Sequence, residues 1–201
     1  LDGFLEGLED GVFEPDAETL TAMRFETRRL ERLARDLGAL SRASEDAFDL
    51  VTSEMDLGDC ARDATRAMSA AFAGADLEIT MDEMTPLPVI ADRDRMAQVF
   101  TNLLRNALQH TPRGGSIVLS GERAEDRVIV RITDTGSGIA AADIDRVFDR
   151  FVRVGDGDGS GGAGIGLTIA RGIAQAHEGE LTVESDGPGS GSSFAVSLPI
   201  G

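Results

Sequence analysis

The sequence predicts an α+β two-layer sandwich, a mixed sheet with helices on one face, preceded by a helical hairpin. Two observations predict this class. Apolar residues recur at helical spacing over residues 1–42, whereas short alternating strands mixed with helices follow from about residue 48. Strands come in adjacent runs rather than in regular alternation with helices, which favours α+β over doubly wound α/β. With 41% hydrophobic residues, the chain has enough apolar side chains for a core.

The N-terminal hairpin carries a narrow apolar seam. A first helix places apolar residues three and four apart, and Gly11 and Pro15 interrupt it. The second helix repeats with heptad spacing, at Met23, Leu30, Leu33, Leu37 and Leu40. Because such a stripe needs partner helices, we expect a homodimer through a four-helix bundle; packing onto the rest of the same chain is the alternative. The predicted domains are residues 1–46 and 47–201.

The second region reads as a succession of short elements. Helices are expected over residues 57–72, from a cap at Asp92 onward, and over 165–176. The expected strands are 77–81, 89–91, 116–120, 127–133, 180–185 and 193–198, and a Gly/Asp-rich loop spans 154–162.

The charge balance excludes several functions. The net charge is −17, which disfavours nucleic acid as a partner. All 19 basic residues are arginine, so neither a lysine-dependent phosphate loop nor a Schiff-base enzyme fits. The single cysteine and two histidines disfavour a disulfide or a metal cluster. No apolar run is long enough for a membrane span, so we expect no direct membrane contact here.

Four local features carry chemistry, and the first is a polar stripe. Asn102, Asn106 and Gln109 fall on one side of the helix that follows Asp92. An amide oxygen there can bind Mg²⁺ together with substrate phosphates. A solvated helix flank is the alternative.

The second feature is Asp134, at the end of an apolar strand and followed by Gly136 and Gly138. A carboxylate there can accept a hydrogen bond from an exocyclic amine such as that of adenine, and glycines let a flat ring approach the backbone. An ordinary Asp-Gly turn is the alternative.

The third feature is a pair of aromatics, Phe148 and Phe151, interleaved with Arg150 and Arg153 at the start of the polar loop. The phenylalanines can latch a lid and the arginines can bind phosphates. Core packing of both rings at helical spacing is the alternative.

The fourth feature is a glycine-rich stretch, 159–166, that opens a helix. Its backbone N–H groups and the helix N-terminus predict an anion site. The stretch satisfies G-x-G-x-x-G, but a polar segment rather than a strand precedes it, so the dinucleotide interpretation fails.

Taken in this order, the four features resemble the N, G1, F and G2 boxes of the Bergerat-fold ATPases, the superfamily of histidine kinases, DNA gyrase, heat-shock-90 and MutL. The boxes correspond to Asn102–His110, Asp134–Gly138, Phe148–Phe151 and Gly162–Gly166. The chain is most similar to a sensor histidine kinase of two-component signalling, since 31–42 resembles the second helix of that family's dimerisation and phosphotransfer domain.

The resemblance implies ATP and Mg²⁺ as cofactors and assigns a role to each matching residue. Asn106 is the implied Mg²⁺ ligand, and Asn102 is the implied partner facing the triphosphate. Asp134 is the implied acceptor for the adenine amino group. The remaining implied nucleotide contacts are Gln109, His110, Gly136, Gly138, Ile139, Phe148, Arg150, Arg153, Gly162, Gly164, Ile165, Gly166, Leu167 and Ser193, with Asn102, Asn106 and Arg150 as the catalytic set.

Departures from the family pattern shape the expected activity. Gln109 stands where a basic phosphate contact is frequent, which shifts that role to Arg150 and Arg153. Asn102 replaces the glutamate base of gyrase-like ATPases, so we expect phosphotransfer rather than rapid hydrolysis.

The acceptor histidine of the family has no counterpart here, and His110 and His177 are expected to be structural. The chain is therefore expected to bind Mg·ATP without phosphorylating itself. The implied phosphoryl route ends on the aspartate of a response-regulator receiver domain. The implied location is cytoplasmic, within a longer protein anchored in the inner or plasma membrane.

Two alternatives stay open. One is an anti-sigma-factor serine kinase of the same fold, which the helical hairpin disfavours. The other is a non-catalytic module that binds nucleotide and dimerises.

Overall fold

The computed structural model describes residues 16, 20, 21, 23, 27, 49–82, 84–150, 152 and 164–200. The chain divides into two compact units, Leu1–Arg42 and Ala43–Gly201. In the first unit, the described positions 20, 21, 23 and 27 are helical, and the Thr27 hydroxyl donates to the Met23 carbonyl at 2.9 Å. The leucines of the predicted seam, Leu30 to Leu40, lie outside the described residues. The seam therefore stays a prediction.

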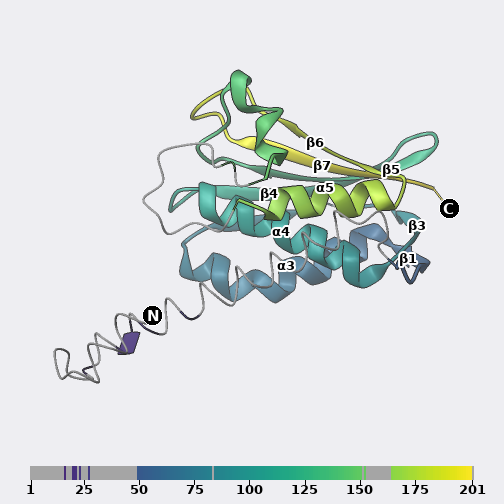
Figure 1. Ribbon diagram of the computed structural model, residues 1–201, viewed down its shortest axis with the longest axis horizontal. Helices are drawn as coiled ribbons and strands as arrows, with labels where there is room; N and C mark the ends of the chain where they lie inside the picture. The colour runs from purple at the N-terminus through teal and green to yellow at the C-terminus, as the bar shows by residue number, and fades with distance from the viewer. Residues whose placement is uncertain are drawn as a thin grey trace. The chain divides into compact units, whose positions relative to one another are not determined.

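A five-stranded mixed sheet forms one layer of the second unit (Figure 1). Its order is β2-β4-β5-β7-β6, with β2 parallel to β4 and the other neighbours antiparallel. The bounds are β2 Glu78–Met81, β4 Ser116–Arg123, β5 Arg127–Asp134, β6 Glu180–Glu184 and β7 Ser192–Pro199.

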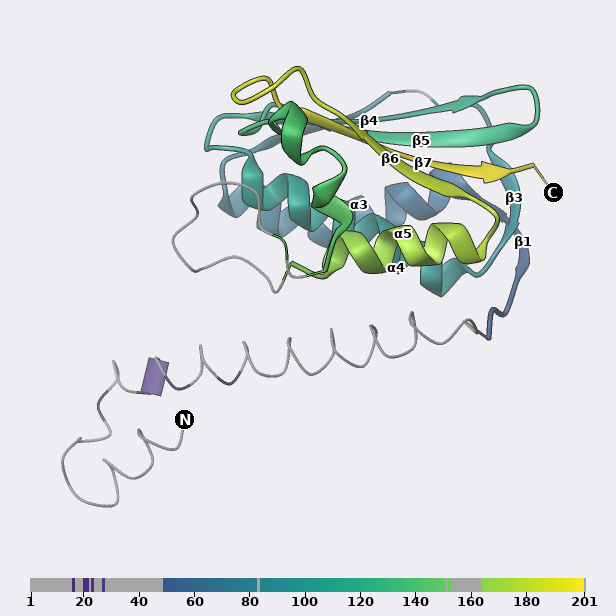
Figure 2. The ribbon, with the colours of Figure 1, turned by 45° about the horizontal axis from the view of Figure 1, so that its top comes forward.

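Three helices cover one face of this sheet (Figure 2). They are α3 (Leu57–Gly74), α4 (Arg93–His110) and α5 (Gly166–Ala176). The core lies between the two layers, where alternate strand residues such as Val128, Val130 and Ile132 meet the apolar sides of the helices. This is the predicted two-layer sandwich.

Aspartates begin two of the three helices. The Asp56 carboxylate caps α3 by accepting from the Asp59 N–H, and the Asp92 carboxylate caps α4 by accepting from the N–H groups of residues 94 and 95. Helix α5 has no side-chain cap. Each capping carboxylate satisfies backbone donors that a helix start leaves without partners.

The sequence did not predict β1 (Ser53–Asp56), which pairs antiparallel with β3 (Pro88–Ala91) in a separate two-stranded sheet. Two 3-10 helices, η1 (Ala141–Asp143) and η2 (Arg146–Phe148), were also not predicted. The polar SEMD stretch of β1 has no apolar alternation to reveal it, because most of this strand stays at the surface.

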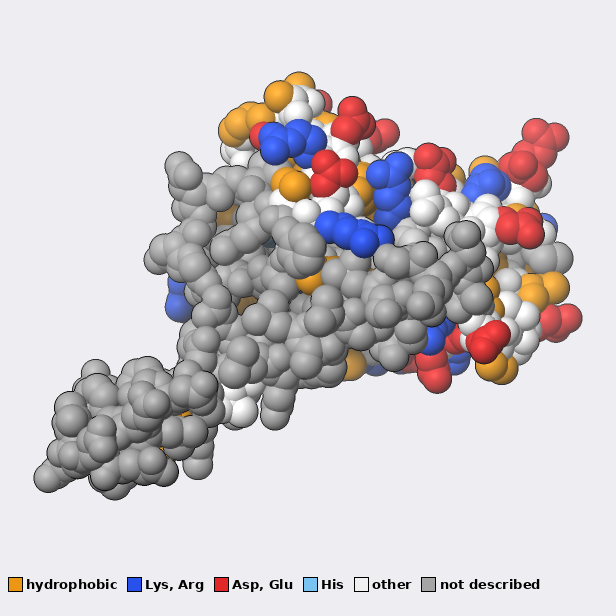
Figure 3. All heavy atoms as spheres, in the orientation of Figure 1, with side chains coloured by type: hydrophobic (Ala, Val, Ile, Leu, Met, Phe, Trp, Pro, Cys, Tyr) orange, Lys and Arg blue, Asp and Glu red, His pale blue; other side chains and the backbone are white. Residues whose placement is uncertain are grey.

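None of the helices in the described part of the chain is long and apolar enough to cross a membrane. Figure 3 shows arginine and acidic side chains interleaved over the described atoms of one face.

Candidate functional site

Asp134 is the last residue of β5, and its side chain lies on the helix-facing side of the sheet. The residue is only 3% exposed. Its Oδ1 accepts from the Gly136 N–H at 2.7 Å, and its Oδ2 accepts from the Ser192 hydroxyl at 2.6 Å. Two donors therefore fix the plane of a buried carboxylate. Such a group can accept one more hydrogen bond from an amine placed beside it.

Ser193, the predicted hydroxyl near adenine, faces away from Asp134. Register pairs Ser192 with Asp134 and Ser193 with Thr133 across β5 and β7. The hydroxyls of Ser193 and Thr133 hydrogen-bond to each other at 2.9 Å, in an exposed setting. Because successive strand residues point to opposite faces, the structure puts Ser192 rather than Ser193 beside the carboxylate.

The G1 glycines sit where no larger residue fits. A Cβ at Gly136 would lie 2.5 Å from both an Asp134 carboxylate oxygen and the His110 carbonyl oxygen. Gly138 has a φ of +66°, and a Cβ there would overlap the Gly187 carbonyl oxygen. The backbone after β5 is thus packed directly against the end of α4 and against the turn between β6 and β7.

That β6–β7 turn is a part of the site that the sequence did not reveal. The Gly189 N–H donates to the Ser137 carbonyl at 2.6 Å. Ser185 Oγ accepts from the N–H of the predicted contact Ile139 at 3.0 Å and donates to the Gly191 carbonyl at 2.7 Å. The bonds to Ser137 and Ile139 hold the G1 segment in place from the side opposite α4.

The polar stripe of α4 reaches the start of α5. Asn102 is half-buried, and its Nδ2 donates to the Gly166 carbonyl at 3.1 Å. Asn106, one turn on, is half-buried, and its side chain forms no hydrogen bond to other described residues. Gln109 is exposed. The amide oxygen of Asn106 is therefore available to a ligand, and a hard cation held by one protein oxygen, phosphates and water suits it.

The N-terminus of α5 is the one helix start without a capping side chain among α3, α4 and α5. Gly164 precedes it with a φ of +69°, while Ile165 is buried and Leu167 half-buried. Its first N–H groups, together with the helix dipole, form a site suited to an anion.

Phe148 is anchored to α5. The Thr168 hydroxyl donates to the Phe148 carbonyl at 2.7 Å. The Arg171 guanidinium lies 4.7 Å above the centre of the Phe148 ring, and Phe194 meets that ring edge-on at 6.4 Å. Phe148 is 8% exposed, which fits the core-packing alternative for this ring; its predicted role in latching a lid stays a prediction. Arg150 is exposed, whereas Phe151, Arg153 and Gly162 lie outside the described residues.

His177 has both ring nitrogens engaged. Its Nδ1 donates to the Ile173 carbonyl at 2.8 Å, and its Nε2 accepts from the Asp92 N–H at 3.0 Å. The ring is 8% exposed. A histidine held in this way is structural, as predicted. The carbonyl of His110, at the end of α4, accepts from the Ser137 N–H at 3.0 Å.

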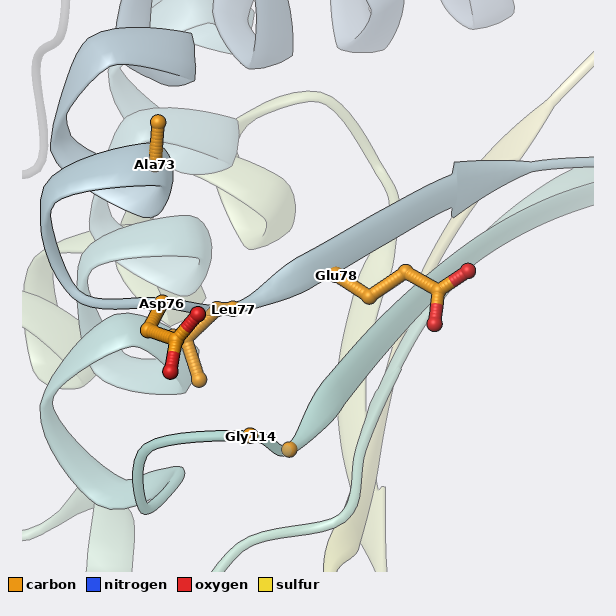
Figure 4. A pocket seen from close by; sticks show the side chains of 6 residues that line it. Ala73, Asp76, Leu77, Glu78 and Gly114 are labelled. Carbon is orange, nitrogen blue, oxygen red and sulfur yellow. The ribbon is translucent and has the colours of Figure 1, made fainter.

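A separate cavity of about 330 Å³ lies between the end of α3 and the α4–β4 turn (Figure 4). Ala73, Asp76, Leu77, Glu78, Gly114 and Gly115 line it. The Glu78 side chain points away from Asp76 in this view, so the two carboxylates do not converge on a ligand. The described residues contain no group of three or more His, Cys, Asp or Glu side chains placed to hold a metal.

Residues 91–201 match the family described as histidine kinase-, DNA gyrase B- and HSP90-like ATPases. The chain belongs to this family. Its matched segment contains Asn102, Asp134 and Gly166, so the predicted N, G1 and G2 boxes all fall within it. The Bergerat ATP-binding fold predicted from those boxes is confirmed.

The individual relatives are histidine kinases. The chain is 33% identical to the signal transduction histidine-protein kinase BaeS of Escherichia coli over 202 residues, which cover 100% of the chain and 43% of BaeS. The Acinetobacter baumannii histidine kinase AdeS has a similar structure, with a TM-score of 0.82 and 28% identity over 99% of this chain and 92% of that one. Full-length ShkA, solved in complex with AMPPNP, gives a TM-score of 0.79 and 26% identity over 93% of this chain and 40% of that one.

Together with the family match, these similarities support a histidine kinase ATPase catalytic domain of the two-component type. The chain spans about half the length of the curated relatives that it matches.

Proposed function

We propose that this chain is the catalytic core of a histidine kinase that binds Mg·ATP and transfers its γ-phosphoryl group to a histidine outside the 201 residues. In this reaction the bond between the γ-phosphorus and its bridging oxygen breaks, a bond from phosphorus to an imidazole nitrogen forms, and ADP leaves. The aspartate of a response-regulator receiver domain would then take the phosphoryl group from the histidine.

The observation that carries the proposal is the buried Asp134 carboxylate with its two fixed donors. Gly136 and Ser192 orient it, so one lone pair is directed to the amino group of an adenine lying on the G1 backbone. A guanine or inosine ring presents a carbonyl oxygen at that position, and two acceptors repel each other. The geometry therefore supports adenine selectivity.

The other side chains act on the triphosphate. Asn102 joins α4 to the uncapped start of α5. Asn106 lies one helical turn after Asn102 on the same side of α4, so its oxygen and the N–H groups of α5 would act on the same phosphates. The amide of Asn106 would hold Mg²⁺, which when bound neutralises phosphate charge. Arg150 and Arg153 would supply the positive charge that Gln109 does not.

Residue 102 is an asparagine, whose amide cannot act as the base that a carboxylate would provide to activate water. This favours transfer of the phosphoryl group to another nucleophile over hydrolysis. His177 has both nitrogens occupied and cannot serve as the acceptor in this conformation. Residues 1–46 would complete the active dimer through their helices, and residues 47–201 would form the ATP-binding domain. Because ATP is the donor, we place this region in the cytoplasm.

The first test is a thermal-shift titration with ATP, with and without Mg²⁺. A ligand at 100 times its Kd adds about 2.7 kcal/mol to the free energy of unfolding. We expect a Mg²⁺-assisted stabilisation that Asp134→Asn loses and Asp126→Asn keeps, since Asp126 lies exposed in the β4–β5 turn. No stabilisation of the unmodified chain by ATP would contradict the proposal.

The second test separates a kinase from a nucleotide-binding module. The chain is incubated with γ-labelled ATP, alone and with an added dimerisation hairpin that carries an acceptor histidine. We expect label on the added hairpin and none on this chain. If the chain binds ATP but no label appears on the hairpin, the chain is a nucleotide-binding module rather than a kinase.

A further inference from the structure

One buried pair, Asp92 and His177, connects three segments that are far apart in the sequence. The His177 ring ends α5, where its Nδ1 donates to the Ile173 carbonyl at 2.8 Å. Its Nε2 accepts from the Asp92 N–H at 3.0 Å. Both residues are 8% exposed, so water competes little for these bonds.

The Asp92 carboxylate extends the connection in two directions. Its Oδ1 caps α4 by accepting from the N–H groups of Asp94 and Arg95, each at 3.1 Å. Its Oδ2 accepts from the Val51 N–H at 3.0 Å. Burial opposes the charged form, yet these three backbone donors and the nearby Arg95 outweigh it and lower the pKa of Asp92.

Val51 lies on the segment that leads from the N-terminal unit into β1. Its side chain is 80% exposed, so apolar burial does little to fix this segment, and the bond to Asp92 ties its backbone to α4.

The pair lies far from the nucleotide site but on the same two helices. Figures 1 and 2 show the start of α4 and the end of α5 beside β1 and β3, whereas α5 begins farther along the helical layer, next to the middle of α4. At 1.5 Å per residue, Gly166 and Ala176 are separated by roughly 15 Å along α5. Asn102 and the Gly166 carbonyl make the corresponding contact between α4 and α5 at the nucleotide site.

We infer that Asp92 and His177 form a positioning relay through which the segment entering at Val51 and the nucleotide site affect one another. The inference rests on the proposed ATP site. A helix moves as a nearly rigid rod, so a small tilt of α5 when phosphates bind its start displaces His177 at its end. The displacement reaches Val51 through Asp92, and the coupling acts equally in reverse because binding linkage is reciprocal.

The chain offers a matched control in Asp56. Its Oδ1 caps α3 by accepting from the Asp59 N–H at 2.9 Å, and its Oδ2 accepts from the Leu87 N–H at 2.8 Å. Helix α3 carries none of the candidate nucleotide residues. In both Asp92→Asn and Asp56→Asn, an amide keeps the capping oxygen and places a donor where the second acceptor stood. The two variants therefore alter the same kind of helix cap and differ in what the cap connects.

The experiment measures hydrogen exchange of the Val51 amide by NMR, with and without Mg·ATP, alongside ATP titrations of the same samples. In the unmodified chain we expect ATP to change the Val51 exchange rate by roughly fivefold or more. Asp56→Asn should retain that change, and Asp92→Asn should lose it while still binding ATP. A purely structural role for Asp92 would shift exchange equally in the presence and absence of nucleotide.

The outcomes separate the two proposals. ATP binding without a change at Val51, or a change that survives in Asp92→Asn, overturns the relay and leaves the nucleotide site standing. An equal loss in Asp56→Asn also overturns it, because the effect would then come from general destabilisation. Failure of the unmodified chain to bind ATP overturns both.

Discussion

Two adjacent serines on β7 provide a sharp test of the site geometry. Ser192 donates to the buried Asp134 carboxylate at 2.6 Å, while Ser193 shares an exposed hydrogen bond with Thr133. The substitutions Ser192→Ala and Ser193→Ala remove the same hydroxyl one residue apart. Their different consequences depend only on which face of the sheet each side chain occupies.

The expected magnitudes follow from the partners. A hydrogen bond to a charged group contributes about 1.5–3 kcal/mol, and Ser192→Ala leaves the buried Asp134 carboxylate with a single donor. An exposed bond between two hydroxyls contributes about 0.5 kcal/mol. For a chain of this size, the Tm should fall by about 3–12 °C in Ser192→Ala and by no more than about 2 °C in Ser193→Ala.

The assay is thermal unfolding followed by circular dichroism, with ATP titrations of the same variants. We expect Ser192→Ala to weaken ATP binding as well, because the freed carboxylate loses its fixed orientation toward adenine. Equal destabilisation by the two variants would refute the reasoning, as would a larger effect of Ser193→Ala.

Three further predictions concern groups outside the adenine contact. Burial raises the pKa of the Cys60 thiol to about 11, so a disulfide reagent at pH 8 should label it only after unfolding in urea; rapid labelling of the native chain would contradict its burial. The lowered pKa of Asp92 means that its contribution is present above the unfolded-state pKa of about 3.9 and is lost as the pH falls through the lower folded-state pKa. Unfolding free energies measured between pH 6 and pH 2.5 should therefore fall less steeply for Asp92→Asn than for the unmodified chain. Arg171→Met should cost about 0.5–1 kcal/mol by removing the cation above the Phe148 ring, and Arg171→Lys should cost less; equal losses in urea unfolding would show that the positive charge above the ring is not what stabilises this contact.

The sequence predicted most elements of the catalytic domain because their signals are local. Asp92 was predicted as the cap of α4, and the alternation of Val128, Val130 and Ile132 marked the core face of β5. The expected strand ended at residue 133, and extending its alternation by one residue gives the buried position that Asp134 occupies. These features depend on neighbours within a few residues, which is the range over which helix and strand periodicity acts.

Ser193 was predicted from the sequence and Ser192 was not considered, although a signal for Ser192 beside Asp134 was present. Phe194, Val196 and Leu198 alternate toward the core, and extending their register by one step places Ser192 with them. Extending the alternation therefore places Ser192, rather than Ser193, beside Asp134.

Other parts of the site carry no local signal. The bond between Asp92 and His177 spans 85 residues, and the contact of Asn102 with Gly166 spans 64. The cation above Phe148 likewise depends on how α5 meets η2. Such contacts exist only once the layers pack together, so spacing in the sequence does not indicate them.

The close approach of Gly138 to Gly187 limits where a reporter can be placed in this domain. Loop tips usually tolerate inserted residues, and the β6–β7 turn would be an obvious choice by position alone. Its backbone instead forms one wall of the G1 segment, so an insertion there would disturb the proposed adenine pocket. The β4–β5 turn around Ala124 and Asp126 is exposed and contains no candidate nucleotide contact. A fluorescent probe for studying nucleotide binding therefore belongs in the β4–β5 turn.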